Sequence, residues 1–139
     1  MLSTTILLLS CIAAWSQVGE PWIHDPSTIM ECDGKYYTFG TGGGGLISSD
    51  GWEWHSGAVR PGGGAAPDVI KIGDRYLIAY SSTGGGLGGG HAGTVLTMWN
   101  KTLDPDSPDF SFSEPIEVAR SEFDEDCDAI DAGLLLDPN

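Results

Sequence analysis

Basic residues are scarce in this chain of 139 residues, which has six Lys and Arg against twenty Asp and Glu and a net charge of −14. Such a charge repels phosphate backbones and anionic membrane surfaces, so the composition argues against nucleic-acid binding and membrane binding. A membrane-spanning helix is not expected either, because no apolar run reaches the ~18 residues that one needs. Apolar residues nevertheless make up 40% of the chain, too much for a disordered protein.

Helical periodicity is also missing after Gln17, because glycine and proline interrupt each stretch before it reaches about ten residues. Short runs typical of β-strands recur instead, at residues 36–39, 69–72, 76–80 and 94–99. Turn pairs such as Asp33-Gly34 and Gly73-Asp74 separate them. These patterns predict an all-β fold.

Cysteine is rare, and one of the three cysteines lies in an N-terminal segment typical of export signals. Residues 6–14 form an apolar core, and Ala14-Trp15-Ser16 predicts cleavage before Gln17, so residues 1–16 are expected to be a signal peptide. A lipoprotein signal ending at Cys11 is the alternative. If Cys11 is removed with the signal peptide, Cys32 and Cys127 remain, either as a disulfide or as two free thiols.

A repeat runs through the mature chain, residues 17–139. Three segments each begin with an aspartate, continue into an apolar strand and reach a turn that contains another aspartate. The leading aspartates are Asp25, Asp68 and Asp131, so the spacings are 43 and 63 residues. A repeat of ~40–50 residues built from short strands is typical of a β-propeller blade.

The number of repeats is too small for a closed propeller, which needs at least about four blades. The chain contains two repeats and the first strand of a third, so we expect it to be the N-terminal part of a longer protein. A complete domain of two sheets is the alternative.

Several motif-like patterns are weak. The glycine runs at residues 40–45 and 84–89 match G-x-G-x-x-G, but neither opens a helix, so packed or flexible loops are expected rather than a phosphate site. Asp124, Asp126 and Asp128 resemble the start of a calcium loop, but the later glycine and glutamate are absent, which leaves a solvated loop or a looser calcium site. Asn100-Lys101-Thr102 is a glycosylation sequon for a eukaryotic host.

Carboxylates are the strongest candidates for chemistry. Asp25 and Asp131 each precede the first strand of a predicted blade, and the first strands surround a propeller axis, so these side chains can converge. Converging carboxylates are what glycoside hydrolysis requires. The aspartates could instead only cap turns. Four tryptophans could stack on sugar rings or pack within blades: Trp22, Trp52, Trp54 and Trp99.

These motifs resemble glycoside hydrolase family 43. The resemblance rests on His24-Asp25-Pro26-Ser27, Ala66-Pro67-Asp68-Val69 and Ala129-Ile130-Asp131, in that order and spacing. Residues 36–42 and 101–105 are also similar to the arabinan endo-1,5-α-L-arabinosidase branch of the family. The resemblance covers the chain from about Pro21 to its end, and it implies a five-bladed β-propeller of which this chain holds two blades and the start of a third.

The resemblance also implies roles for single residues. Asp25 would be the general base that activates water, and Asp131 would raise the pKa of the general acid and orient it. The acid itself is a glutamate in the following blade, beyond this chain. The stretch Asp128, Ala129, Ile130 and Asp131 would line the sugar subsite, and Gly85 would lie in a loop that contacts sugar. No cofactor is implied within this chain, although calcium is implied for the full-length protein.

The expected function is therefore a secreted or periplasmic, monomeric inverting glycosidase that acts on plant cell-wall arabinan. Two alternatives stay open: a non-catalytic propeller that binds carbohydrate, and a related glycosidase that acts on fructan or xylan. The expected partner in each case is a polysaccharide or oligosaccharide.

Overall fold

The computed structural model describes residues 18–83, 93–122 and 128–137. These residues form strands and no helix, which confirms the all-β prediction. The strands are β1 (Val18–Gly19), β2 (Met30–Cys32), β3 (Lys35–Phe39), β4 (Gly44–Ser48), β5 (Glu53–Val59), β6 (Ala65–Ile72), β7 (Arg75–Thr83), β8 (Gly93–Asn100) and β9 (Ile116–Ser121). Within the same residues, no helix is long and apolar enough to cross a membrane.

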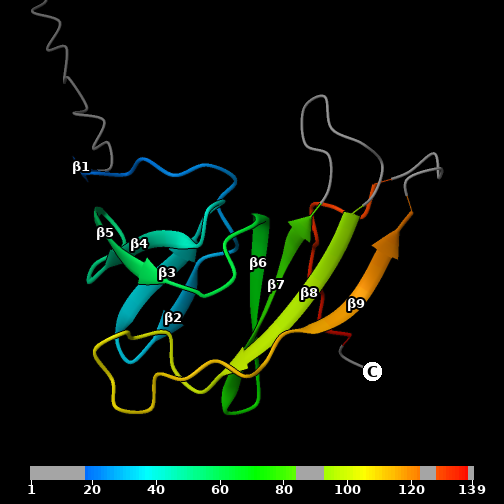
Figure 1. Cartoon of the computed structure of the whole chain (residues 1–139). Helices are drawn as coiled ribbons and strands as arrows, with labels where there is room; N and C mark the ends of the chain where they lie inside the picture. Colours follow the sequence, from blue (N-terminus) through cyan, green and yellow to red (C-terminus); the bar gives the residue numbers. More distant parts are fainter. Residues whose placement is uncertain (1–17, 84–92, 123–127, 138–139) are drawn as a thin grey trace, which may run out of the picture.

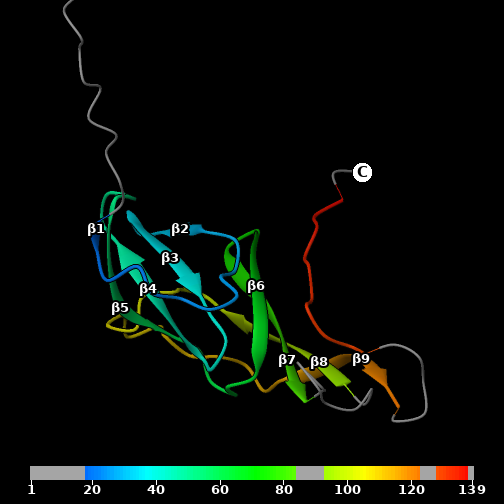
Figure 2. The ribbon, with the colours of Figure 1, turned by 90° about the horizontal axis from the view of Figure 1, so that it is seen from above.

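The strands form two sheets that lie side by side (Figures 1 and 2). In the first sheet the order is β1-β5-β4-β3-β2, and in the second it is β6-β7-β8-β9. Neighbouring strands are antiparallel, except that β1 pairs with β5 in parallel. Each sheet is therefore built on an antiparallel four-stranded meander, the arrangement expected of a propeller blade.

Turn chemistry places the hairpins. Asp33 and Gly34 connect β2 to β3 with φ values of +52° and +77°, and Gly73 begins the next tight turn with φ +62°. Successive positive φ values are the requirement of a type I′ hairpin turn, which Asp-Gly satisfies. Both turns were predicted from the sequence, as were β3, most of β8, the second half of β6 and the first half of β7. The strand predicted after Asp131 in the third repeat is wrong, because residues 132–137 pair with no neighbouring strand among the described residues.

Four strands were not predicted: β1, β4, β5 and β9. The β4 strand begins with Gly44 and Gly45, and β5 contains Gly57. Because glycine is unfavourable in strands, residue propensities do not predict either strand. A Cβ on Gly45 would lie 2.2 Å from the carbonyl oxygen of Thr38. Glycine is therefore required at this position by the close approach of β3.

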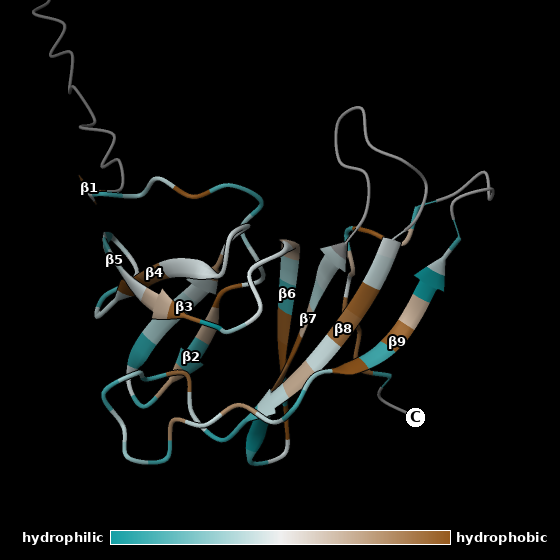
Figure 3. Ribbon diagram, viewed as in Figure 1, coloured by the Kyte–Doolittle hydropathy of each residue, from teal (hydrophilic) through white to brown (hydrophobic). Residues whose placement is uncertain are grey.

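The core lies between the two sheets. Tyr37 and Phe39 from β3 are fully buried against Val69 and Ile78 of the second sheet, together with Leu103 from the loop after β8. Burying a side chain of this size contributes about 1.5–3 kcal/mol relative to leaving it exposed. In the second sheet, apolar residues prevail in β8 and in the second half of β6, whereas charged residues interrupt the apolar residues of β9 (Figure 3).

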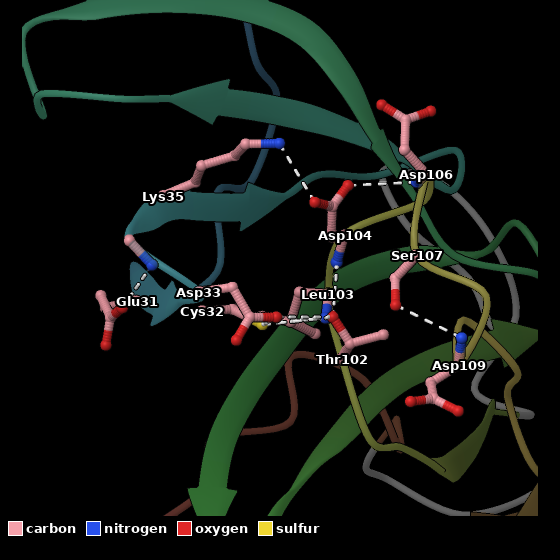
Figure 4. A network of polar contacts seen from close by, with 11 residues as sticks. Glu31, Cys32, Asp33, Lys35, Thr102, Leu103, Asp104, Asp106, Ser107 and Asp109 are labelled. Atoms are coloured by element: carbon pink, nitrogen blue, oxygen red, sulfur yellow. Dashed lines mark hydrogen bonds and ion pairs between the residues drawn. The ribbon is translucent and has the colours of Figure 1, made fainter.

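A polar network joins the turn between β2 and β3 to the loop after β8 (Figure 4). The Nζ of Lys35 lies 3.1 Å from Oδ2 of Asp104, and the hydroxyl of Thr102 donates to Asp33. The sulfur of Cys32 accepts the N–H of Leu103 at 3.3 Å. Cys32 is a free thiol and is buried, whereas Cys127 lies outside the described residues.

The predicted glycosylation site is wrong for the folded chain. Asn100 is only 2% exposed, and its side-chain oxygen accepts the N–H groups of Thr102 and Ser111. The asparagine therefore fixes the loop after β8 and is not accessible to a glycan-transferring enzyme.

Candidate active site

An open pocket of about 330 Å³ lies where three segments of the chain meet. The segments are the approach to β2, the start of β6 and the stretch that follows β9, and two of the predicted catalytic residues, Asp25 and Asp131, line the pocket together. The full lining is Asp25, Pro26, Thr28, Ala66, Pro67, Asp68, Asp131 and Ala132. Asp25 and Asp131 therefore converge on one pocket, as predicted for aspartates that precede the first strands of different repeats.

Each of the three segments has one residue in the left-handed region of backbone space. The φ values are +48° for Asp25, +40° for Ala66 and +56° for Asp131. Residues other than glycine rarely adopt such values, and sparsely populated conformations of this kind cost about 1–3 kcal/mol each and cluster at functional sites.

The shared backbone conformation corrects the predicted repeat. The sequence aligned Asp68 with Asp25 and Asp131, but the residue with the matching conformation is Ala66. Asp68 therefore lies two residues further along its segment, at the position that corresponds to Ser27. The aspartate pattern alone put the second repeat out of register by two residues.

The side chain of Asp25 is exposed and held from one side. Its Oδ2 accepts the hydroxyl of Thr41 at 2.8 Å and lies 2.8 Å from Nδ1 of His24. The same hydroxyl accepts the N–H of Ala66 at 2.9 Å, which directs its proton to the carboxylate. Thr41 thus connects Asp25 to the beginning of the second sheet.

Asp68 is partly buried, and its carboxylate accepts three backbone N–H groups. Oδ1 accepts from Thr28 at 3.1 Å and from Val69 at 2.9 Å, and Oδ2 accepts from Leu134 at 2.8 Å. Burial acts to raise the pKa of this carboxyl, but the hydrogen bonds from Leu134, Thr28 and Val69 outweigh it, so the pKa lies below its ordinary value.

Asp131 is exposed and lies in the stretch that returns from β9 past β6 (Figure 2). Asp128, Ala129 and Ile130, the other predicted subsite residues, are half-buried and do not line the pocket. The N–H of Ala129 donates to the hydroxyl of Ser121, and a Cβ on Gly93 would lie 2.2 Å from Oδ1 of Asp128. These residues pack against the second sheet, and Gly85 lies outside the described residues.

A second open pocket, of about 380 Å³, adjoins the site through His24 and Thr41 and is bordered by Trp22. Trp22 is 90% exposed, so its indole is available to stack on a ligand, and Trp52 is also exposed. Trp54, in contrast, is buried and donates its ring N–H to the carbonyl of Gly51, so of the two roles expected for it, it has the packing one.

The first glycine run begins as a closely packed loop, one of the two forms predicted for it, and its last two residues, Gly44 and Gly45, begin β4. A Cβ on Gly40 would lie 2.7 Å from the side chain of Ile23 and 2.9 Å from the carbonyl oxygen of His24. The guanidinium of Arg60, buried against the ring of Tyr80, donates to the carbonyls of Gly40 and Gly63. The second run, along with Asp124 and Asp126, lies outside the described residues.

The part of the chain that the structure describes contains no candidate metal site, because no three His, Cys, Asp or Glu side chains are placed there to hold an ion. Sequence reasoning missed Thr41 and Asp68 as members of the site. Thr41 was noted only as part of a family-like motif, and Asp68 was treated as a copy of Asp25. The signal that identifies both is their hydrogen bonding across segments, which no sequence pattern displays.

The fold and the pocket define an all-β protein with a carboxylate-lined site. Comparison with known proteins then narrows the class. The chain is 32% identical over 129 residues to a probable arabinan endo-1,5-α-L-arabinosidase A of Aspergillus flavus. The alignment covers 83% of this chain and 38% of that protein. No protein-family model matches the chain.

Solved structures give the same result. An exo-1,5-α-L-arabinanase from a bovine ruminal metagenomic library is 32% identical with a TM-score of 0.72, over 84% of this chain and 42% of that one. The GH43 endo-arabinanase of Bacillus licheniformis, 24% identical, shares the fold with a TM-score of 0.69, over 84% of this chain and 44% of that one.

The resemblance predicted from the motifs is confirmed: the chain is similar to the GH43 arabinanases over about four fifths of its length. It spans 38% of the length of the curated relative described above.

Proposed function

We propose that this chain is the N-terminal part of an inverting glycoside hydrolase of family 43 that cleaves α-1,5-linked arabinan. Its two sheets would be the first two blades of a five-bladed β-propeller, and residues 128–137 would begin the third. The observation that carries the proposal is the single pocket that Asp25 and Asp131 line together, although they come from distant parts of the sequence.

Asp25 is suited to act as the general base. It is exposed to the pocket, and within the described residues both of its side-chain contacts reach Oδ2, which leaves Oδ1 to accept a proton from water. Water activated in this way would attack the anomeric carbon as the glycosidic bond breaks on the opposite side of the sugar.

Asp131 would act on the general acid, a glutamate supplied by the part of the full-length protein beyond this chain. Its negative charge would raise the pKa of that acid and keep it protonated until the leaving oxygen accepts the proton. Asp128, Ala129 and Ile130 would support the sugar subsite from the second sheet, and Gly85, which is outside the described residues, would contribute a further sugar contact, as the family resemblance implies.

Residues 1–16 would direct the protein out of the cell, where arabinan is found, and the enzyme would act as a monomer. Calcium binding, implied for the full-length protein by its resemblance to the family, is assigned to the part beyond this chain. Trp22 would extend the sugar-binding surface next to the reacting centre.

The proposal is tested with the full-length protein on debranched arabinan. Asp25→Asn keeps the size of the side chain but removes the proton acceptor, so kcat should fall by at least ~10²–10⁴-fold while arabino-oligosaccharide binding persists. Asp74→Asn is the matched control, because Asp74 lies in the exposed turn between β6 and β7, at the other end of β6 from the pocket.

Proton NMR of the first products checks the stereochemistry, since inversion of an α-linkage releases the β-anomer. Retention would overturn the inverting mechanism. A wild-type protein that binds arabino-oligosaccharides without cleaving arabinan would instead be a carbohydrate-binding propeller, and one that cleaves only fructan or xylan would require a different substrate assignment.

A further inference from the structure

The carboxylate of Asp68 connects the two segments that carry the predicted catalytic residues. Thr28, whose N–H donates to Oδ1, lies three residues after Asp25. Leu134, whose N–H donates to Oδ2, lies three residues after Asp131. Each oxygen of Asp68 therefore holds one of the two segments. In both segments the contact is made three residues after the predicted catalytic aspartate.

Asp68 is itself well anchored. It lies in β6, Oδ1 also accepts the N–H of Val69, and Val69 is buried in the core between the sheets. Unlike Asp25 and Asp131, which are exposed, Asp68 is partly buried. Hydrogen bonds to a charged acceptor are stronger than those between neutral groups, so the carboxylate is a rigid point from which both segments are held.

We propose that Asp68 is a positioning residue that sets the placement of Asp25 relative to Asp131. This inference rests on the function proposed above and assigns no contact between Asp68 and the reacting atoms. The two segments bond to different oxygens of the carboxylate, so a side chain that offers a single acceptor oxygen at this position would lose one of the two contacts. Ser27, at the corresponding position of the first repeat, accepts the N–H of Phe39 in β3, and the contacts of its hydroxyl within the described residues stay with its own segment and that strand.

The first test measures backbone amide hydrogen exchange in the full-length protein. The N–H groups of Thr28 and Leu134 should exchange at least about tenfold faster in Asp68→Ala than in the wild type, because both lose a charged acceptor. In Asp68→Asn, the single remaining oxygen should protect one of the two segments. Unchanged exchange at both positions in Asp68→Ala would overturn the inference.

Asp104→Asn is the control for a merely structural effect. Asp104 also accepts a backbone N–H, from Asp106, and contacts Lys35, but it lies at the end of the sheets opposite the pocket. Its substitution should leave exchange at Thr28 and Leu134 unchanged. A similar acceleration in this variant would mean that general loosening of the fold, and not loss of the Asp68 contacts, is being measured, and would overturn the inference.

The second test is kinetic. A misplacement of about 1 Å can cost ~10²-fold, so kcat on arabinan should fall by roughly 10²-fold in Asp68→Asn with KM changed much less. If Asp68 acts through Asp131, the double variant with Asp131→Asn should lose less than the product of the two single losses. A wild-type kcat in Asp68→Asn, or fully multiplicative losses in the double variant, would overturn the positioning role.

The two proposals fail in different ways. A wild-type protein that cleaves no arabinan would overturn the proposed function, and the exchange measurement would still decide whether Asp68 holds the two segments. An active wild type with unchanged exchange and unchanged kcat in the Asp68 variants would overturn the positioning role alone.

Discussion

Aspartates occupy both ends of the paired sheets, in opposite settings. At the end where β6 begins, Asp25 and Asp131 are exposed in a pocket and have left-handed backbone conformations. At the other end, Asp104 is partly buried and paired with Lys35, and Asp33 accepts the hydroxyl of Thr102 (Figure 4). One end therefore offers carboxylates to a ligand, and the other uses them to join the two sheets.

The difference shows that composition does not separate functional from structural acidic residues. Twenty acidic side chains are distributed along the chain, and among those that the structure describes, Asp25 and Asp131 combine exposure, a left-handed backbone and convergence on one pocket. Strain persists only where surrounding contacts enforce it, as Thr41 and Asp68 do around the pocket. Contacts from other segments, more than charge, distinguish the candidate site.

The largest expected effect is at the structural end. Leu103→Ala removes a fully buried side chain from the core between the sheets, so the free energy of unfolding should fall by about 2–5 kcal/mol. Thermal unfolding of the full-length protein measures the loss. The kcat of the protein that remains folded should be unchanged, and a large drop in kcat would mean that the two ends are not independent.

A smaller effect is expected from Asp131→Asn at the pocket. If Asp131 has the role proposed above, removing its negative charge lowers the pKa of the general acid, so the basic limb of the pH–rate profile should move to lower pH. Each unit of movement corresponds to about 1.4 kcal/mol. Rates on arabinan measured across the pH range test this prediction, and a basic limb that does not move would make Asp131 a turn residue only.

Asp104→Asn should change the response to acid. Hydrogen bonds from the N–H of Asp106 and from Lys35 hold the pKa of Asp104 below its ordinary value. Its contribution to stability is therefore complete above the unfolded-state pKa of about 3.9 and is lost as the pH falls through the lower folded-state value. In the variant, Tm should be lower near neutral pH but should converge on the wild-type Tm in acid. A constant difference in Tm at every pH would contradict this account.

The smallest effect is expected from Ala66→Gly. Glycine tolerates the φ of +40° that strains alanine, but it gains freedom in the unfolded chain, so the net stabilisation should be only about 0.5 kcal/mol. Denaturant unfolding of both proteins measures it. Destabilisation by this change would show that the methyl group of Ala66 packs in a way that outweighs the strain.

The sequence predicts part of the fold well, and the reasons for the limits are physical. Strands rich in β-branched and aromatic residues, such as β7, and turns with an Asp-Gly pair follow from local preferences. The β4 and β5 strands do not. Gly45 in β4 is required by the close approach of the β3 backbone, and a Cβ on Gly57 in β5 would lie 3.0 Å from the side chain of Ile47, and both are tertiary requirements. Asn100 was likewise misjudged, since a sequon does not reveal burial.

The candidate site was predicted in outline and not in detail. Asp25 and Asp131 were placed together because both precede the first strand of a repeat. The alignment of Asp68 with them was wrong, because the repeat is defined by backbone conformation, which Ala66 shares and Asp68 does not. The connecting role of Asp68 depends on N–H groups from remote segments, and any residue except proline can supply such a group.

The β9 strand has a consequence for handling the protein in solution. It forms one edge of the second sheet, and Ile116 and Val118 are both more than half exposed along it. An edge of this kind can pair with other molecules, which would give turbidity that rises with protein concentration. The net charge of −14 makes copies of the protein repel one another. Salt weakens this repulsion, because at 0.1 M charges farther apart than about 10 Å are largely screened. Clear samples are therefore expected in dilute buffer, with self-association increasing as salt is added.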